Sequence, residues 1–498
     1  MQCQKYWQRR GSTYALLFDK ETHYSVVEIR YEIPTMSDKP KYAVIVTVEG
    51  LGTNLVGCYG GAIAPTKNLD SFACRSIVFD QFWSDTFRPI DILESMWTGL
   101  HFAVRSGNSS FAESTILSES ILERAMLITD SITIIEESTR DDFGSVLLIE
   151  SQSDQSIDGS ESGDLDNSEY DLDGSNLEDN DAEDDQPQFT RLFQAALGKW
   201  ATQLDEFPIL WIHSRGLNGT WDAPYEYRCV MCDEGDPEPP FDMTPARLKM
   251  TDDTDPDEVF GLACSLGAQS MVLDDAWAMI EEVLEELGIA SDCLQIFAGV
   301  QGYPIGEHGF VGHISEALYA ETLHLPLIVR PGDQLDVGVR VPFMVQPNSI
   351  LMTIENWVNG DMEPREPTMD AARTDLAKET DALPAENWPI KNQLAYSCYH
   401  GQVHVAVPAW SCRWSTDPML VDSEENQRVE LFATPDDRWQ QNEVSQRAQA
   451  ILEELTLHRD EWLHCCLASG STHTDGSTPE SASIEWKPLS SELTHPVR

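Results

Sequence analysis

Four short apolar runs constrain the fold more than any other feature of the sequence. They occupy residues 43–48, 208–213, 293–298 and 325–329. Runs of this length without polar alternation are typical of strands that are buried on both faces of a sheet. Segments with helical periodicity lie between them, at residues 91–104, 190–204 and 270–288, the last ending on Gly288. This alternation predicts an α/β fold with a large, mostly parallel mixed sheet flanked by helices.

Changes in composition predict the domain boundaries. Residues 1–35 show no clear period and are interpreted as an N-terminal extension, and the α/β domain is expected over residues 36–360. Residues 151–187 are rich in Asp, Glu, Ser and Gly and contain no Lys or Arg. Such a segment buries too little apolar surface to offset its ordering entropy, so it is predicted to be a disordered insertion.

The C-terminal part is predicted to form a separate small unit. Residues 361–392 are acidic and Pro-rich and are interpreted as a second linker. Strand patterns over residues 393–415 and an amphipathic helix over 442–458 predict an α+β subdomain at 393–460. Residues 461–498 are expected to be a polar tail.

Charge and cysteine content limit the partners and the compartment. The net charge of −53 predicts repulsion of nucleic acid and of anionic membranes, so neither is an expected partner. The 11 cysteines are scattered and odd in number, which is typical of reduced thiols. Cys229 and Cys232 form a lone C-x-x-C pair that is interpreted as two loop thiols. The N-terminus has no apolar signal-peptide core, and a cytoplasmic location is expected.

Several short motifs occur in a recognisable order. They are the strand ending in Glu49-Gly50-Leu51-Gly52, then Gly57-Cys58-Tyr59-Gly60, Pro65 to Asp70, Thr98-Gly99, Gly306-Glu307-His308-Gly309, Leu325 to Gly332, and Leu431 to Trp439. In order and spacing they resemble the sulfatase branch of the alkaline-phosphatase superfamily over nearly all of residues 41–455. The resemblance implies an alkaline-phosphatase-like fold with a small C-terminal subdomain.

The resemblance also implies where a metal ion would bind. Ester hydrolysis in this family uses a divalent cation held mostly by carboxylates, an activated nucleophile and cationic side chains that neutralise developing charge. The family's metal-ligand positions fall here on Glu49, Gly50, Val300 and Gln301. Only Glu49 offers a carboxylate, and Gln301 offers one neutral oxygen. No cofactor is therefore expected.

The catalytic positions of the family are changed as well. Its nucleophile falls on Pro89, its motif proline on Asp91, its arginine on Leu93 and a histidine on Asn218. Proline supplies no nucleophile. The resemblance therefore implies a degenerate, catalytically inactive sulfatase-like protein, one that acts as a binding or scaffold protein for an unknown protein partner.

One alternative keeps an enzymatic function. It is a hydrolase of sulfate or phosphate esters with a relocated or reduced metal site, close to the positions where the family binds its metal ion. Its candidate residues are Arg88, Asp91, Glu49, His101, His308 and Gln301. In that case Glu49 and Asp91 would hold a Ca²⁺ or Mg²⁺ ion, and bound metal would distinguish the two hypotheses. Otherwise His308 is expected to be a hydrogen-bonded loop histidine.

Overall fold

The computed structural model describes residues 2–9, 12–18, 24–29, 41–106, 119–137, 142–149, 186–313, 315–332, 338–359, 393–416, 427–434, 436–469, 490 and 493. The chain divides into two compact units, Met1–Pro40 and Lys41–Arg498. The predicted linker 361–392 and all but the last two residues of the predicted insertion 151–187 lie outside the described residues.

The first unit contains secondary structure that the sequence did not predict. Strands β1 (Gln2–Arg9), β2 (Ser12–Phe18) and β3 (Tyr24–Ile29) pair antiparallel into a small sheet. The sequence shows no clear period here because these strands mix apolar and charged residues without strict alternation.

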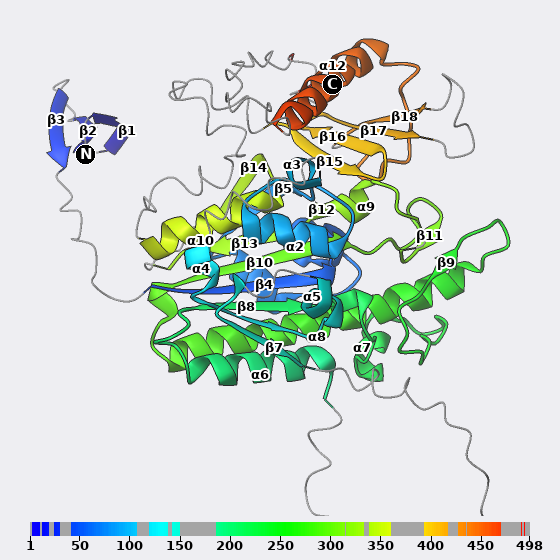
Figure 1. Ribbon diagram of the computed structural model, residues 1–498, viewed down its shortest axis with the longest axis horizontal. Coiled ribbons are helices and arrows are strands. Elements are labelled where there is room, and N and C mark those ends of the chain that lie inside the picture. Colours follow the sequence, from blue (N-terminus) through cyan, green and yellow to red (C-terminus); the bar gives the residue numbers. More distant parts are fainter. Residues whose placement is uncertain are drawn as a thin grey trace, which may run out of the picture. The chain divides into compact units, whose positions relative to one another are not determined.

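A large mixed sheet forms the centre of the second unit (Figure 1). Among the described residues its nine strands are β4 (Tyr42–Gly50), β5 (Ile77–Trp83), β6 (Ala125–Thr129), β7 (Ser145–Leu148), β8 (Ile209–Ser214), β10 (Cys293–Gly302), β12 (His324–Leu325), β13 (Leu327–Arg330) and β14 (Val339–Val345). Strands β10, β4, β8, β6 and β7 are neighbours in that order and parallel, while β13 pairs antiparallel with β10 and β5. All four predicted runs lie in this sheet, so the predicted α/β fold is confirmed.

Helices cover both faces of the sheet, which explains why the central strand β4 is apolar over most of its length. All nine residues of β4 are buried. Val44 and Val46 face a core built with α6 (Gln188–Ala201) and α8 (Pro256–Glu286). Ala43 and Ile45 face a second core built with α2 (Pro89–Thr98) and α10 (Ile350–Asn359). The two helix layers lie on opposite sides of the sheet in Figure 1.

Helices α2 and α8, which flank the sheet, differ markedly from their predicted bounds. The helix predicted over 91–104 is interrupted: α2 ends at Thr98, Gly99 caps it with a φ of +69°, and α3 (Phe102–Ser106) follows. Helix α8 begins well before the predicted residue 270, because the Asp255 side chain accepts a hydrogen bond of 3.0 Å from the Asp257 N–H and caps its start. Its predicted end is right, since Gly288 has a φ of +68°.

The predicted small C-terminal subdomain is present. Strands β15 (Ala395–Tyr399), β16 (Gln402–Val407), β17 (Trp410–Thr416) and β18 (Gln427–Ala433) form an antiparallel sheet, with α12 (Gln449–Ser469) after them. The helix begins later than the predicted Asn442, whose N–H instead binds the Asp437 carboxylate in a turn at 2.8 Å. It also continues into the predicted polar tail, because Trp462 is buried and stacks on Tyr396. Across the described ranges, no helix has the length and apolarity needed to cross a membrane.

Candidate functional site

The expected metal-ligand positions lie at the carboxyl ends of the neighbouring strands β4 and β10. Glu49 is paired with Gln301 and Gly50 with Gly302. The register skips Val300, so β10 is irregular at this point, and the Val300 side chain is fully buried in the core on the α2 side of the sheet. The structure therefore brings Glu49 and Gln301 together, while the Val300 side chain is packed in the core.

Gly50 leaves no space for a ligand side chain. Its φ is +76°, a conformation that residues with a Cβ rarely adopt. A Cβ added there would lie 2.8 Å from the Leu217 Cβ and 3.0 Å from the Asn218 side-chain oxygen. The position that carries an acidic metal ligand in the family is thus closed by both backbone conformation and packing.

A closed hydrogen-bond network occupies the region between these strands. The Asn218 Nδ2 group donates to Glu49 Oε2 at 3.2 Å and to Gln301 Oε1 at 3.1 Å. The second Glu49 oxygen, Oε1, lies 3.3 Å from His213 Nε2. The Asn218 oxygen in turn lies 3.1 Å from His313 Nε2. An amide N–H₂ group therefore lies between the two oxygens that would face a cation.

His313, one of the two histidines of the network, is held as a neutral donor by its surroundings. Burial, with a smaller contribution from Arg247, lowers the pKa of His313 to about 4, so it is neutral at ordinary pH. Its Nε2 faces an acceptor and must carry the proton, while its Nδ1 is buried without a partner in the described part of the chain. His213 Nδ1 lies 3.1 Å from the Thr47 hydroxyl, which accepts from the Trp211 N–H at 3.0 Å.

These residues do not fit a Ca²⁺ or Mg²⁺ ion. Such ions need several oxygen ligands to replace their hydration shell. Both Glu49 oxygens and the Gln301 oxygen already accept hydrogen bonds, and Gly50 and Val300 supply none. In the described ranges no group of three or more His, Cys, Asp or Glu side chains is arranged to hold a metal ion.

The expected nucleophile segment serves to begin a helix. Pro89 is the first residue of α2, where its missing N–H costs nothing, and Asp91 lies in the first turn, where a carboxylate favours the helix dipole. Leu93 is fully buried in the core. Arg88 precedes the helix, and its Nε lies 3.9 Å from the Asp91 carboxylate, a partly exposed and weak ion pair.

Among the described residues, the contacts of His101 and His308 differ from those of Glu49 and Gln301. Gln301 joins Glu49, and its N–H₂ group donates to the Phe87 carbonyl at 2.8 Å, next to Arg88. His101 instead lies 3.0 Å from the Tyr396 carbonyl and packs against Trp462, and burial lowers its pKa.

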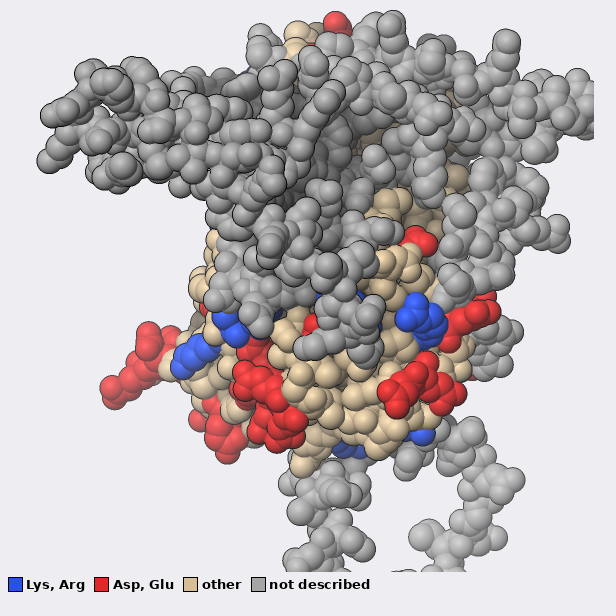
Figure 2. Space-filling model, turned by 90° about the vertical axis from the view of Figure 1, so that its left-hand side faces the viewer, with Lys and Arg blue, Asp and Glu red and all other residues tan. Residues whose placement is uncertain are grey.

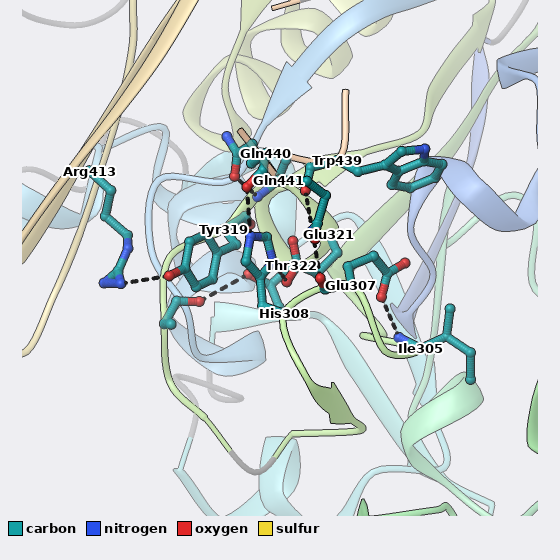
Figure 3. A network of polar contacts seen from close by, with 12 residues as sticks. Ile305, Glu307, His308, Tyr319, Glu321, Thr322, Arg413, Trp439, Gln440 and Gln441 are labelled. Carbon is teal, nitrogen blue, oxygen red and sulfur yellow. Dashed lines mark hydrogen bonds and ion pairs between the residues drawn. The ribbon is translucent and has the colours of Figure 1, made fainter. Parts of the chain in front are cut away.

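His308 belongs to a separate network that joins the α/β core to the C-terminal subdomain (Figure 3). Its ring stacks on Tyr319 at 3.6 Å, its Nδ1 lies 2.6 Å from the Glu321 carboxylate, and its Nε2 lies 3.0 Å from the Gln440 carbonyl. Burial opposes its charge, but the hydrogen bond and charge of Glu321 and the Gln440 carbonyl raise its pKa overall. The predicted structural role of His308 as a hydrogen-bonded loop residue agrees with these contacts.

The segment from Pro65 to Asp70, another of the motifs that resemble sulfatases, also makes contacts that stabilise the fold. The Asp274 carboxylate of α8 accepts from the backbone N–H groups of Leu69 at 2.8 Å and Asn68 at 3.0 Å, at the start of α1 (Lys67–Ala73). Burial raises the pKa of Asp274 despite these bonds. The contact anchors α1 to α8.

The sequence alone did not reveal most of the hydrogen-bond network around Glu49. Asn218 was identified only as a replaced histidine, and neither His213 nor His313 was singled out. His213 had a weak signal, since it is a polar residue in the buried run 208–213. His313 had none, because it meets Asn218 across 95 residues of sequence.

Comparison with known proteins gives similarity at the level of structure. No protein-family model and no curated protein matches the chain in sequence. BT4656, solved in complex with its substrate D-glucosamine-2-N,6-O-disulfate, is 14% identical with a TM-score of 0.59, over 86% of this chain and 98% of that one. BT1596, a 2-O GAG sulfatase, is 13% identical with a TM-score of 0.57, over 86% and 93%.

A third structure extends the similarity beyond sulfatases. The phosphonate monoester hydrolase SpPMH from Silicibacter pomeroyi is 15% identical with a TM-score of 0.55, over 85% of this chain and 95% of that one. Similarity at these identities concerns the fold, because function depends on the residues of the site. The chain therefore has the fold of sulfatases and alkaline-phosphatase-like hydrolases.

Proposed function

We propose that this chain is a sulfatase-like protein that does not hydrolyse sulfate or phosphate esters and that acts by binding a protein partner. The observation that carries the proposal is the Asn218 amide group, which donates to both Glu49 and Gln301. These bonds use the oxygens that a catalytic cation would need.

Three separate features oppose hydrolysis. The residues around Glu49 do not fit a divalent cation, so no metal polarises the ester. Pro89 at the start of α2 cannot attack sulfur or phosphorus. Leu93 is buried where the family places an arginine, so that cationic group is missing at the position. Each of these losses typically costs orders of magnitude in rate.

The proposal includes partners and location. The net charge of −53 supports a protein partner rather than nucleic acid or membrane, and no cofactor is part of it. Nine cysteines among the described residues are free thiols, which supports a reducing compartment, so we place the protein in the cytoplasm.

The test is an activity assay with matched variants. Purified protein is assayed on an aryl sulfate and an aryl phosphate with added Ca²⁺, Mg²⁺ or Mn²⁺, and its metal content is measured. The wild type, Glu49→Ala and the exposed control Glu285→Ala should all show background rates. Metal-dependent turnover that disappears in Glu49→Ala and persists in Glu285→Ala would overturn the proposal in favour of a hydrolase with a reduced metal site.

A further inference from the structure

We propose that an exposed apolar surface formed by Val230, Phe241 and Met243, the 230–243 surface, docks a basic and apolar segment of a partner protein. This inference rests on the partner-binding part of the proposed function. It does not depend on whether the pocket near Glu49 is active.

The 230–243 surface is unusual in its exposure. Phe241 is 71% exposed, Val230 54% and Met243 48%. Phe241 and Val230 are the two most exposed large apolar side chains in the part of the chain that the structure describes. Three exposed large apolar side chains within one short stretch of the chain mark interaction sites more often than isolated ones do.

The loop that carries these side chains is firmly held. The Arg228 guanidinium is buried and donates to the carbonyl groups of Pro240, of Asp242 at 2.9 Å and of Trp221 at 2.6 Å. The Met243 carbonyl accepts from the Trp221 N–H at 2.6 Å. Phe241 is therefore exposed because the backbone around it is fixed in that position.

An aromatic pair orients Phe241 further. Its ring stacks on Tyr225 with centroids 4.0 Å apart and an interplanar angle of 8°. The Tyr225 hydroxyl donates to the Pro239 carbonyl at 3.2 Å, which ties α7 (Tyr225–Arg228) to the same loop. A rigid aromatic side chain presented in this way loses little conformational entropy when it is covered by a partner.

The charge around the apolar centre has one sign. Residues 229–244 contain five carboxylates and no Lys or Arg, and the neighbouring Arg228 is buried against backbone carbonyls. The five are exposed: Asp233, Glu234, Asp236, Glu238 and Asp242. An apolar centre with a charged rim is the usual anatomy of a protein interface, and this rim is complementary to Lys and Arg.

Acidity alone does not distinguish this surface. Figure 2 shows another face of the molecule on which carboxylates also form broad red patches. The 230–243 surface differs in having exposed apolar side chains on a loop that the Arg228 hydrogen bonds hold in place. A second copy of the chain would bring the same acidic rim and be repelled, so the occupant we infer is a basic segment with apolar side chains from a different protein.

The experiment uses a defined peptide pair and the full chain. The probe is a fluorescent synthetic peptide of alternating lysine and leucine, and its control replaces each leucine with serine. Binding is measured by fluorescence anisotropy at about 0.15 M salt, where exposed charges are screened beyond about 8 Å. We expect the lysine–leucine peptide to bind at least about tenfold more tightly than the lysine–serine peptide.

Matched variants place the binding. Phe241→Ser should weaken the lysine–leucine peptide at least about tenfold, whereas Val339→Ser, at another exposed apolar residue, should leave it unchanged. Since both side chains are exposed, both variants should keep the wild-type unfolding temperature. Neutralising the rim with Asp233→Asn and Glu234→Gln should weaken binding and reduce its salt dependence.

Several outcomes would overturn the inference. They are equal binding of the two peptides, no binding of either, an unchanged affinity in Phe241→Ser, or a self-association of the wild type that Phe241→Ser abolishes. The ester-hydrolysis assay is read separately. Turnover would contradict the claim of inactivity and leave peptide docking in place, while a failed peptide test would not affect the argument from the hydrogen bonds around Glu49.

Discussion

Replacing His308 with Gln tests whether the contact between the α/β core and the C-terminal subdomain depends on a charged pair. Both ring nitrogens face acceptors, the Glu321 carboxylate at 2.6 Å and the Gln440 carbonyl at 3.0 Å. Only the protonated imidazolium can donate to both. Gln can keep one of these bonds but carries no charge.

The expected loss in the free energy of unfolding follows from the burial of the His308–Glu321 pair. The Glu321 side chain is 4% exposed, the His308 side chain is 16% exposed, and the second Glu321 oxygen has no partner in the described residues. Removing one partner of a buried pair costs about 3–5 kcal/mol, and the partial exposure of His308 places the loss near 3 kcal/mol. Glu321→Gln in the same background removes the stranded charge, so the double variant should recover about 1–2 kcal/mol.

The pH dependence of the stability difference between wild type and His308→Gln gives an independent test, because its direction is fixed by the raised pKa of His308. The pKa of His308 is raised in the folded state. Its stabilisation is therefore fully present below the unfolded value of about 6.5 and is lost as pH rises through the higher folded pKa. Urea unfolding followed by tryptophan fluorescence should show a large gap between wild type and His308→Gln at about pH 6 that narrows at about pH 9. A gap below about 1 kcal/mol, or one that does not change with pH, would refute the reasoning.

Three further predictions concern other sites. Asn218→Asp places a carboxylate against Glu49 and should lower the free energy of unfolding by about 3 kcal/mol, more than Asn218→Ala, as measured by urea unfolding. Asp274→Ala leaves two N–H groups at the start of α1 without an acceptor and should cost about 2 kcal/mol by the same measurement; an unchanged midpoint would contradict the anchoring role. Burial raises the pKa of Cys264 to about 12, so at neutral pH iodoacetamide should label it at least about a hundredfold more slowly than the exposed Cys74, as followed by mass spectrometry.

The sequence was sufficient for the central sheet because its strands are buried on both faces. β4 and β10 are apolar almost throughout, and such runs are visible without any knowledge of their partners. The end of α8 was also predictable, since a glycine such as Gly288 adopts a positive φ readily. The break between α2 and α3 was missed because apolar periodicity continues across Gly99.

The candidate site was predictable only in part. Glu49 and Gln301 were found because motif order placed them at adjacent strand ends, where the structure pairs them. The role of Asn218 was not visible, because its partners are separated from it by 169 and 83 residues. Contacts over such separations depend on how loops cross the sheet, which local patterns do not specify. The absence of ester hydrolysis is a prediction that the activity assay tests.

Gly50 has a consequence for how this pocket could change under selection. A carboxylate at this position would clash with Leu217 and strain a backbone with a φ of +76°. Asn218 would also have to release Glu49 before any cation could approach. Replacing Gly50 with an acidic residue, or replacing Asn218, would each lower stability without giving metal binding. Neither change is therefore favoured as a first step. A metal site could therefore evolve here only through several substitutions that occur together, because each single step is selected against.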